Sequence, residues 1–447
     1  MRRALLLACL LASTPVLADD PPASDEPTAS DVAQEPLPGA ESGRLDEPEH
    51  DSTLRNIGQG ALVVPRVAVE ITMAPVRASV WALDRYQLVD RWKQLFFDDS
   101  YTYGLYPTAV LDSSYGLTIG ARFVHRNLFG EREHLALRGG AGGEYRGQIS
   151  GDLRTGQRFG ERTQLGIKGE VERRPDDAYY GIGNSTDGTA AHHRQELMRA
   201  TTRVDLRLVD SLHALVAGAL TDLSYGESSD APSMGTLFDP TMLTGWTGVR
   251  NVYGELELRW DRRGYSTSYD PHGTFDTGFL LAAYTGRVHQ LEAGNDYWRY
   301  GGEVQQFFGL GAGPRAISTR LHVEGVSGAL EDVAFTELPQ LGGKVLLRGY
   351  PRDRFRDRLA AVTSLEYTWD LGRYPMASVF VDAGRVFGGV GDIEPTKLRV
   401  GYGVSLQLHE SRHFLASVSL ASSIDGGVFL DLAFDPVFDI EPRVEQR

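Results

Sequence analysis

The sequence predicts an all-β membrane protein, a 16-stranded antiparallel transmembrane β-barrel preceded by a short amphipathic helix. Three observations support this prediction. From about residue 105 onward apolar and polar residues alternate with a period of two. Beyond the first 20 residues no apolar run approaches the ~20 residues that a membrane helix needs. Connections after odd-numbered strands are long and most of those after even-numbered strands are short, as in barrels with loops at one end and turns at the other.

The first 18 residues have the features of a secretory signal peptide. Two arginines precede an apolar core from Ala4 to Leu11, and the small residue Ala18 precedes an acidic stretch. The alternative is a lipoprotein cleavage box ending at Cys9, but its apolar core of about five residues is short for that purpose. Cleavage after Ala18 removes Cys9, the single cysteine, so the mature chain is expected to form no disulfide.

Residues 19–60 form an acidic, Pro-rich tail that we expect to be disordered. Residues 61–98 follow as an amphipathic helical segment, in which apolar residues recur at spacings of three and four. Its apolar face includes Trp81, Leu88 and Trp92. This face must be covered by the rim of the barrel, by its lumen or by the membrane interface. We expect the helix to cap or enter the periplasmic mouth.

Sixteen candidate strands lie within residues 99–438, the predicted barrel, and residues 439–447 form a C-terminal tail. In the clearest candidates charges share one face, as where Glu257 lies between Leu256 and Leu258. A soluble β-sandwich also shows such alternation, so the lengths of the connections favour the barrel. The candidates are residues 105–112, 116–126, 132–142, 145–154, 162–172, 195–207, 211–222, 249–260, 274–285, 297–308, 315–326, 358–370, 376–386, 398–408, 413–421 and 426–434.

Composition and motifs exclude several classes of function. The net charge of −15 argues against a nucleic-acid partner. His192 and His193 lack a third ligand at a suitable spacing, so the sequence predicts neither a metal site nor a cofactor. The nucleophile motif Gly-x-Ser-x-Gly is absent from the sequence. We therefore predict that the protein is not an enzyme.

A basic loop is the most distinctive stretch of the chain. It begins with Leu347, Arg348, Gly349 and Tyr350, and five arginines fall between positions 348 and 358. The following strands offer Glu366 and Asp382, each on the polar face opposite an apolar face. Both carboxylates therefore point away from lipid, and they are candidates to pair with the loop.

These residues resemble a known family. Arg-Gly-Tyr in a long loop, Glu366 in the next strand and Phe380-x-Asp382-x-Gly384 in the one after are similar to BamA/TamA-type outer-membrane barrels (the bacterial surface antigen superfamily). The resemblance covers roughly residues 99 to 438. It implies a 16-stranded barrel whose loop folds into the lumen, where Arg348 would pair with Asp382 and Glu366.

The resemblance also implies a function, which is insertion or translocation of protein or lipid in the outer membrane of a Gram-negative bacterium. Outer-membrane lipid and the barrel-assembly machinery would be partners, and the client is unknown. No polypeptide-transport-associated domain, a module typical of this family, is recognisable between the tail and the first strand. Two alternatives remain open: a passive outer-membrane channel, and a surface or structural barrel with binding outer loops.

The seam between the first and last strands is a further candidate feature. Pro107 removes a hydrogen-bond donor from the first strand, and Gly426-Gly427 lie at the start of the last. A seam with few hydrogen bonds could open sideways toward lipid. Alternatively, these residues only mark the ends of strands.

Overall fold

The computed structural model describes residues 85–86, 91, 94–112, 115–143, 145–185, 189–230, 232–264, 277–292, 294–310, 315–371, 375–410 and 413–433. All of them belong to the unit from Pro75 to Arg447. The predicted signal peptide, acidic tail and C-terminal tail, and the helix residues Trp81, Leu88 and Trp92, lie outside the described residues. Among the described residues, no helix has both the length and the apolarity needed to cross a membrane.

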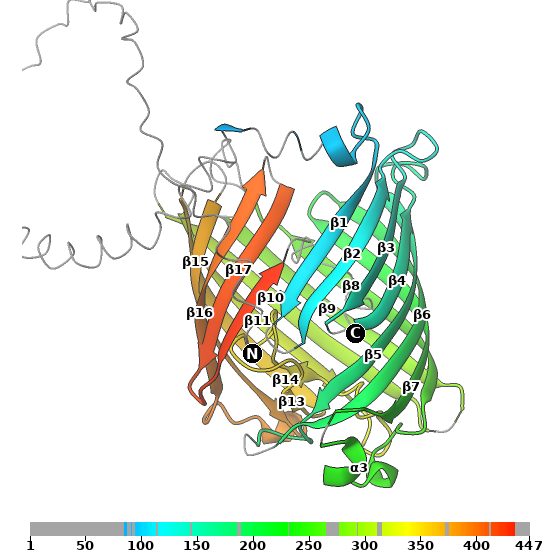
Figure 1. The fold of residues 1–447 in the computed structure, drawn as a ribbon, viewed down its shortest axis with the longest axis vertical. Coiled ribbons are helices and arrows are strands. Elements are labelled where there is room, and N and C mark those ends of the chain that lie inside the picture. The colour runs from blue at the N-terminus through cyan, green and yellow to red at the C-terminus, as the bar shows by residue number, and fades with distance from the viewer. Residues whose placement is uncertain are drawn as a thin grey trace, which may run out of the picture. The chain divides into compact units, whose positions relative to one another are not determined.

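Sixteen antiparallel strands close into a barrel, which confirms the predicted fold (Figure 1). Each strand pairs with its neighbours in sequence, except that β11 pairs directly with β14. The strands are β1 (Tyr103–Asp112), β2 (Gly116–His125), β3 (His134–Gly142), β4 (Tyr145–Arg154), β5 (Thr163–Tyr179), β6 (Ala191–Val209), β7 (Leu212–Glu227), β8 (Val249–Asp261), β9 (Gly278–Gln290), β10 (Tyr297–Gly309), β11 (Arg315–Val326), β14 (Leu359–Asp370), β15 (Pro375–Phe387), β16 (Arg399–Glu410), β17 (His413–Ser423) and β18 (Val428–Ala433).

Most strand boundaries lie within a few residues of the predicted ones, but β5, β6 and β7 are longer than expected. β5 runs seven residues beyond its predicted end at residue 172, through the charged stretch Arg173–Asp177. This extension pairs with the first residues of β6, for example Asp177 with His193. Tertiary pairing therefore continues the sheet where the sequence loses the apolar alternation of a membrane strand.

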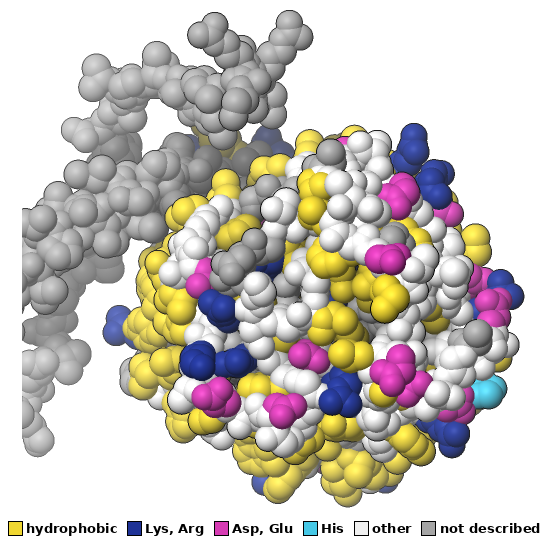
Figure 2. Space-filling model, turned by 90° about the horizontal axis from the view of Figure 1, so that it is seen from below, with side chains coloured by type: hydrophobic (Ala, Val, Ile, Leu, Met, Phe, Trp, Pro, Cys, Tyr) yellow, Lys and Arg dark blue, Asp and Glu magenta, His cyan; other side chains and the backbone are white. Residues whose placement is uncertain are grey.

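The two ends of the barrel differ. The long connections β5–β6, β7–β8, β11–β14 and β15–β16 meet at one end, here called the loop end, and the opposite end is called the turn end. The loop end carries α3 (Met234–Leu237), η2 (Pro240–Met242) and η3 (Val390–Asp392), and also the two-stranded sheet of β12 (Gln340–Leu341) and β13 (Phe355–Arg356). In Figure 2, which views the loop end, side chains of the described loops spread across the end of the barrel.

The alternation along the strands places apolar side chains outside and polar or large buried ones inside. On β15, Val379 and Val381 are 41% and 46% exposed, whereas Phe380 is 2% and Asp382 is 0% exposed. The same period of two occurs on β8, where buried Glu255 and Glu257 alternate with exposed apolar side chains. An apolar outer face and a polar inner wall are typical of a transmembrane barrel.

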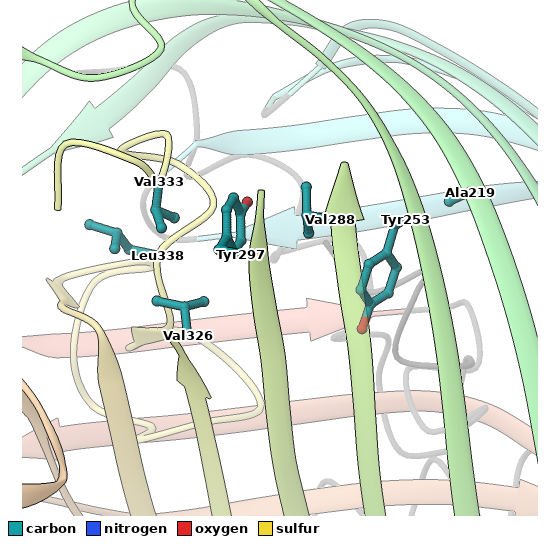
Figure 3. Close-up of a cluster of buried hydrophobic side chains, with 7 residues drawn as sticks. All are labelled: Ala219, Tyr253, Val288, Tyr297, Val326, Val333 and Leu338. Atoms are coloured by element: carbon teal, nitrogen blue, oxygen red, sulfur yellow. The ribbon is translucent and has the colours of Figure 1, made fainter. Parts of the chain in front are cut away.

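The β11–β14 connection packs against the inner wall. Its residues Val333 and Leu338 lie in a buried cluster with Tyr297 and Val288 of the strands (Figure 3). A second cluster joins Leu347, Tyr350 and Phe355 of the connection to inward-facing residues of β14 and β15. Apolar burial against the wall thus gives this long connection a defined path.

The barrel closes through a short seam. Within the described residues, β1 and β18 pair at two positions, Val110 with Ala433 and Leu111 with Leu432. By comparison, β1 pairs with β2 at every position from Tyr103 to Asp112. Because each ladder position contributes backbone hydrogen bonds, the seam between β1 and β18 is the weakest junction described in the wall.

Candidate functional site

The tip of the basic loop lies directly on the backbone of the inner wall. A Cβ atom on Gly349 would lie 2.1 Å from the carbonyl oxygen of Ser422 on β17, and one on Gly401 of β16 would lie 1.6 Å from the carbonyl oxygen of Arg348. Gly349 also has a φ of +91°, and Leu347 one of +60°. Glycines at both contact points therefore permit an approach that a side chain would block.

Arg348 contacts both carboxylates that the sequence singled out. Its backbone N–H donates to Asp382 Oδ2 at 2.8 Å, and Nε and Nη2 donate to Oδ2 and Oδ1 of Asp382, both at 2.9 Å. Nη1 donates to Glu366 Oε2 at 2.8 Å. The guanidinium carbon lies 3.5 Å from the centroid of the Phe380 ring, a cation–π geometry. Planar, forked donors match two carboxylates in this way where a lysine would not.

The spacing of these residues follows from strand geometry. Phe380 and Asp382 lie two positions apart on β15 and therefore share its inner face. On the neighbouring strand Glu366 is directly opposite Phe380. Gly384 continues the same face, and a Cβ there would lie 2.9 Å from the carbonyl oxygen of Ala361. The three-residue motif on β15 therefore supplies a ring, a carboxylate and a close strand contact on one wall.

Tyr350 makes a different connection. Its hydroxyl donates to Asp425 Oδ2 at 2.6 Å, and Arg399 Nη1 donates to Asp425 Oδ1 at 2.9 Å. Burial, together with the Asp425 carboxylate, raises the pKa of the Tyr350 hydroxyl to about 12, so it remains a neutral donor. Asp425 lies in the turn immediately before β18. The loop is therefore linked to the strand that forms one side of the seam.

Asn184 is a residue that sequence analysis missed. Its side-chain amide donates to the carbonyl oxygen of Val386 at 2.8 Å and accepts from the backbone N–H of Val386 at 3.1 Å. Arg399 Nη2 donates to the backbone oxygen of Asn184 at 2.8 Å. The β5–β6 connection is thereby joined to the ends of β15 and β16. An asparagine in a Gly-rich loop gives no sequence signal for such a contact.

Two further loop arginines are buried beneath the loop end. The guanidinium of Arg354 lies 4.3 Å from the ring centroid of Tyr180, and that of Arg356 lies 4.9 Å from the ring centroid of Tyr179. Arg356 is 2% exposed and donates to the carbonyl oxygen of Phe335 at 3.0 Å. These two side chains lie among aromatic rings at this end of the barrel, and Arg356 also lines a cavity.

A cavity of about 930 Å³ lies between the wall strands β1–β11 and the β11–β14 connection, which includes the basic loop. Its lining extends from His134 and Arg154, near the turn end, to Asp177 and Arg356, beneath the loop end. Charges on its wall are paired across strands: Arg199 Nε lies 3.1 Å from Glu170 Oε1. The cavity is large enough for solvent or a polar ligand, and its wall is built from ion pairs.

The described residues offer no constellation for metal binding. His192 and His193 belong to β6 rather than to a loop, and no group of three His, Cys, Asp or Glu side chains in the described part of the chain is arranged to hold an ion. The contacts of Arg348 and Tyr350 hold the basic loop against the wall and close to the seam.

Comparison with known proteins supports a family assignment. Residues 127–425 match the model of the Omp85 superfamily domain. A sequence search of characterised proteins returned no match. Among solved structures, BamA from Haemophilus ducreyi lacking POTRA domains 1–3 is similar with a TM-score of 0.55 and 14% identity, covering 74% of this chain and 69% of that one.

Two further structures are less similar. CdiB from Acinetobacter baumannii gives a TM-score of 0.45 at 11% identity, and CdiB from Escherichia coli gives 0.46 at 10% identity. Each alignment covers 74% of this chain, and they cover 60% and 62% of the respective CdiB chains. The match to the BamA structure agrees with the barrel fold.

Proposed function

Because this chain belongs to the Omp85 superfamily, we propose that it is an outer-membrane factor that inserts or translocates a client polypeptide or lipid through its seam. The mature chain would reside in the outer membrane of a Gram-negative bacterium, with the loop end toward the outside. Its own insertion would depend on the barrel-assembly machinery.

One observation carries this proposal: the two-position seam between β1 and β18 lies beside a loop that contacts the wall on the β18 side of it. Arg348 contacts β14 and β15, and Tyr350 contacts the turn before β18. A wall with one weak junction can open there at lower cost than elsewhere. The loop would set the position of the strands on the β18 side.

The experiment is a reversible lock on the seam. Cysteines at Leu111 and Leu432, which are directly paired, can be oxidised to a disulfide that holds β1 to β18. The full chain is reconstituted in liposomes and tested for insertion of a urea-unfolded eight-stranded barrel protein. Movement of a fluorescent phospholipid between leaflets is followed by albumin extraction. The lock should abolish whichever activity is present, and reduction should restore it.

A control disulfide between two strands away from the seam distinguishes the loss of seam opening from a general stiffening of the barrel. Leu281 and Val304 are directly paired on β9 and β10, and both side chains are exposed. A disulfide there should leave activity unchanged. Equal activity with the seam locked and unlocked would refute the proposal.

A passive channel is the second candidate, and the cavity of about 930 Å³ favours it. A channel conducts through the lumen, so its single-channel current should not depend on the seam lock. Persistent current together with no insertion or lipid movement, locked or unlocked, would favour the channel.

A further inference from the structure

A belt of arginines surrounds part of the outer face of the barrel. Arg173 on β5, Arg194 on β6, Arg250 on β8 and Arg287 on β9 all lie on the outward side of their strands, and we call them the belt arginines. Their side chains are 44%, 42%, 51% and 57% exposed. They therefore project from the same outward face as the apolar residues.

The belt lies at one edge of the apolar face. On β8 the outward residues that follow Arg250 are Val252, Gly254, Leu256, Leu258 and Trp260, none of them charged. Ten residues separate Arg250 from Trp260, which at a strand tilt of about 40° corresponds to roughly 25 Å along the membrane normal. That is the height of the apolar band of a transmembrane barrel. Arg250 and Trp260 thus mark the two edges of this band.

Aromatic residues also lie at the two edges of this apolar band. Trp260 contacts Phe279 edge-on at 5.0 Å at the turn end, as expected for an interfacial girdle. At the other edge Trp298 of β10 is directly paired with Arg287, whose guanidinium lies 5.8 Å from its ring centroid. An arginine facing lipid is costly at mid-bilayer and nearly free at the interface. The belt arginines therefore lie at the level of the lipid headgroups.

Carboxylates contact each of the belt arginines. Asp296 accepts a hydrogen bond from Arg287 Nη2 and lies within hydrogen-bond distance of His289 Nδ1, both at 2.9 Å. The Asp296 side chain is 26% exposed, whereas that of Arg287 is 57% exposed. Asp222 accepts from Arg250 at 2.6 Å. Arg173, Arg194 and Arg287 each contact a carboxylate through one nitrogen. Arg250 is held more fully, because Nε and Nη2 donate to Asp222 and Nη1 lies 3.4 Å from Glu292 Oε1. Guanidinium groups with free edges bind phosphate in a forked geometry.

We propose that the belt arginines bind phosphate groups of an outer-leaflet glycolipid along β5–β9. The exposed guanidinium groups favour a phosphorylated headgroup, and the apolar band directly below accommodates acyl chains. Four carboxylates share the belt and repel anions: Glu196, Asp222, Glu292 and Asp296. A lipid with two separated phosphates, able to reach two belt arginines, therefore binds more tightly than a lipid with one.

This inference uses the outer-membrane orientation proposed above but not the transport activity. Lipid binding is measured on purified full-length chain in detergent without any client. Failure of seam-dependent insertion would leave the lipid result unaffected, and the reverse also holds.

The test is a titration with a fluorescent diphosphorylated glucosamine-disaccharide lipid (lipid A), compared with its monophosphorylated form. Arg250→Gln and Arg287→Gln should each weaken binding by about fivefold. Arg315→Gln is the matched control, because Arg315 is an outward, exposed arginine at the turn end of β11. It should leave the affinity unchanged. The heat-modifiable gel shift of each variant reports that the barrel is folded, and Arg→Lys variants at both belt positions, which keep the charge, should retain partial binding.

Four outcomes would overturn the proposal. The first is equal binding of the diphosphorylated and monophosphorylated lipids. The second is a loss of affinity in Arg315→Gln equal to that in the belt variants. The third is competition by inorganic phosphate as strong as that by unlabelled lipid, which would indicate a free-anion site. The fourth is unchanged lipid affinity in the belt variants together with loss of an outer-membrane protein that co-purifies with wild type, which would make the belt a protein interface.

Discussion

The Tyr350 hydroxyl donates a 2.6 Å hydrogen bond to the carboxylate of Asp425, which links the tip of the basic loop to the turn before the last strand. Two positions earlier, Arg348 holds the same tip to Asp382 and Glu366. Three consecutive residues thus connect β14 and β15 with the β18 side of the seam. Movement of the loop would be transmitted to β18 through Asp425.

The first prediction concerns this link. Tyr350→Phe removes the hydroxyl and leaves Asp425 paired with Arg399 alone. A hydrogen bond to a charged group contributes about 1.5–3 kcal/mol, so local opening of β18 should become at least about tenfold more frequent. Hydrogen exchange measured by mass spectrometry should be faster in peptides covering β17 and β18 and unchanged in those covering β9 and β10.

Tyr402→Phe provides the control, since Tyr402 is an exposed tyrosine on the outer face of β16. It loses the same hydroxyl without affecting Asp425. If both variants exchanged at the wild-type rate, Tyr350 would have no part in positioning the seam.

The second prediction concerns Arg348. Arg348→Ala leaves Asp382, which is 0% exposed, and Glu366 without their shared cation. Loss of one partner of a buried ion pair costs ~3–5 kcal/mol. The barrel wall should still form, but residues 340–358 should become more accessible to protease and activity should fall. Asp382→Ala should behave similarly, and the double variant should be less than additive.

Arg352→Ala is the control within the same loop, because Arg352 is about one-third exposed and its Nε lies 3.5 Å from the partly exposed Asp353 of the loop itself. It should change protease access little. Strict additivity of Arg348→Ala and Asp382→Ala would show that the two residues act independently.

The barrel could be predicted from the sequence, because alternation with a period of two is a local property of each strand. The sequence also singled out Arg348, Glu366 and Asp382 together, since the two acids occur on the polar faces of strands that follow the loop closely. The structure places all three in contact. This contact could be predicted because the three residues lie close together in the sequence.

Contacts between distant segments could not be read in this way. Asn184 and Val386 are 202 residues apart, and Tyr350 and Asp425 are 75 apart. Each partner is an ordinary polar or backbone group in a loop, in a turn or at the end of a strand, and only the closed barrel brings them together. The same holds for Arg354 and Arg356, whose aromatic partners come from β5 and the β5–β6 connection.

The third prediction follows from Asn184. Asn184→Ala removes both side-chain hydrogen bonds to the Val386 backbone, so the β5–β6 connection should be held less firmly to β15. We expect greater protease access at residues 180–190 and larger single-channel currents in planar bilayers. Ser185→Ala, at the adjacent exposed position, should have little effect. Unchanged currents in Asn184→Ala would exclude a role for this contact in closing the loop end.

The last prediction concerns pH and the turn end. Glu133, in the β2–β3 turn, accepts from the backbone N–H groups of Phe129 and Glu131, both at 3.0 Å, and from Arg158 Nε of the next turn at 2.9 Å. Burial raises the pKa of this carboxyl, but these hydrogen bonds lower it further, and the result is a pKa of about 2 instead of 4.5. The folded barrel therefore binds this proton less readily than the unfolded chain.

Because the pKa of Glu133 is lower in the folded barrel than in the unfolded chain, the ionised carboxylate stabilises the fold. This contribution is fully present above about pH 4.5 and is lost as the pH falls toward about 2. Glu133→Gln lacks the contribution at every pH. Wild type should therefore exceed Glu133→Gln in the midpoint temperature of its heat-modifiable gel shift at neutral pH, and the difference should shrink below about pH 4.5. Glu131→Gln, a neighbouring exposed carboxylate, should instead track wild type across the range. A constant difference between wild type and Glu133→Gln at all pH values would mean that the Glu133 charge does not join the two turns.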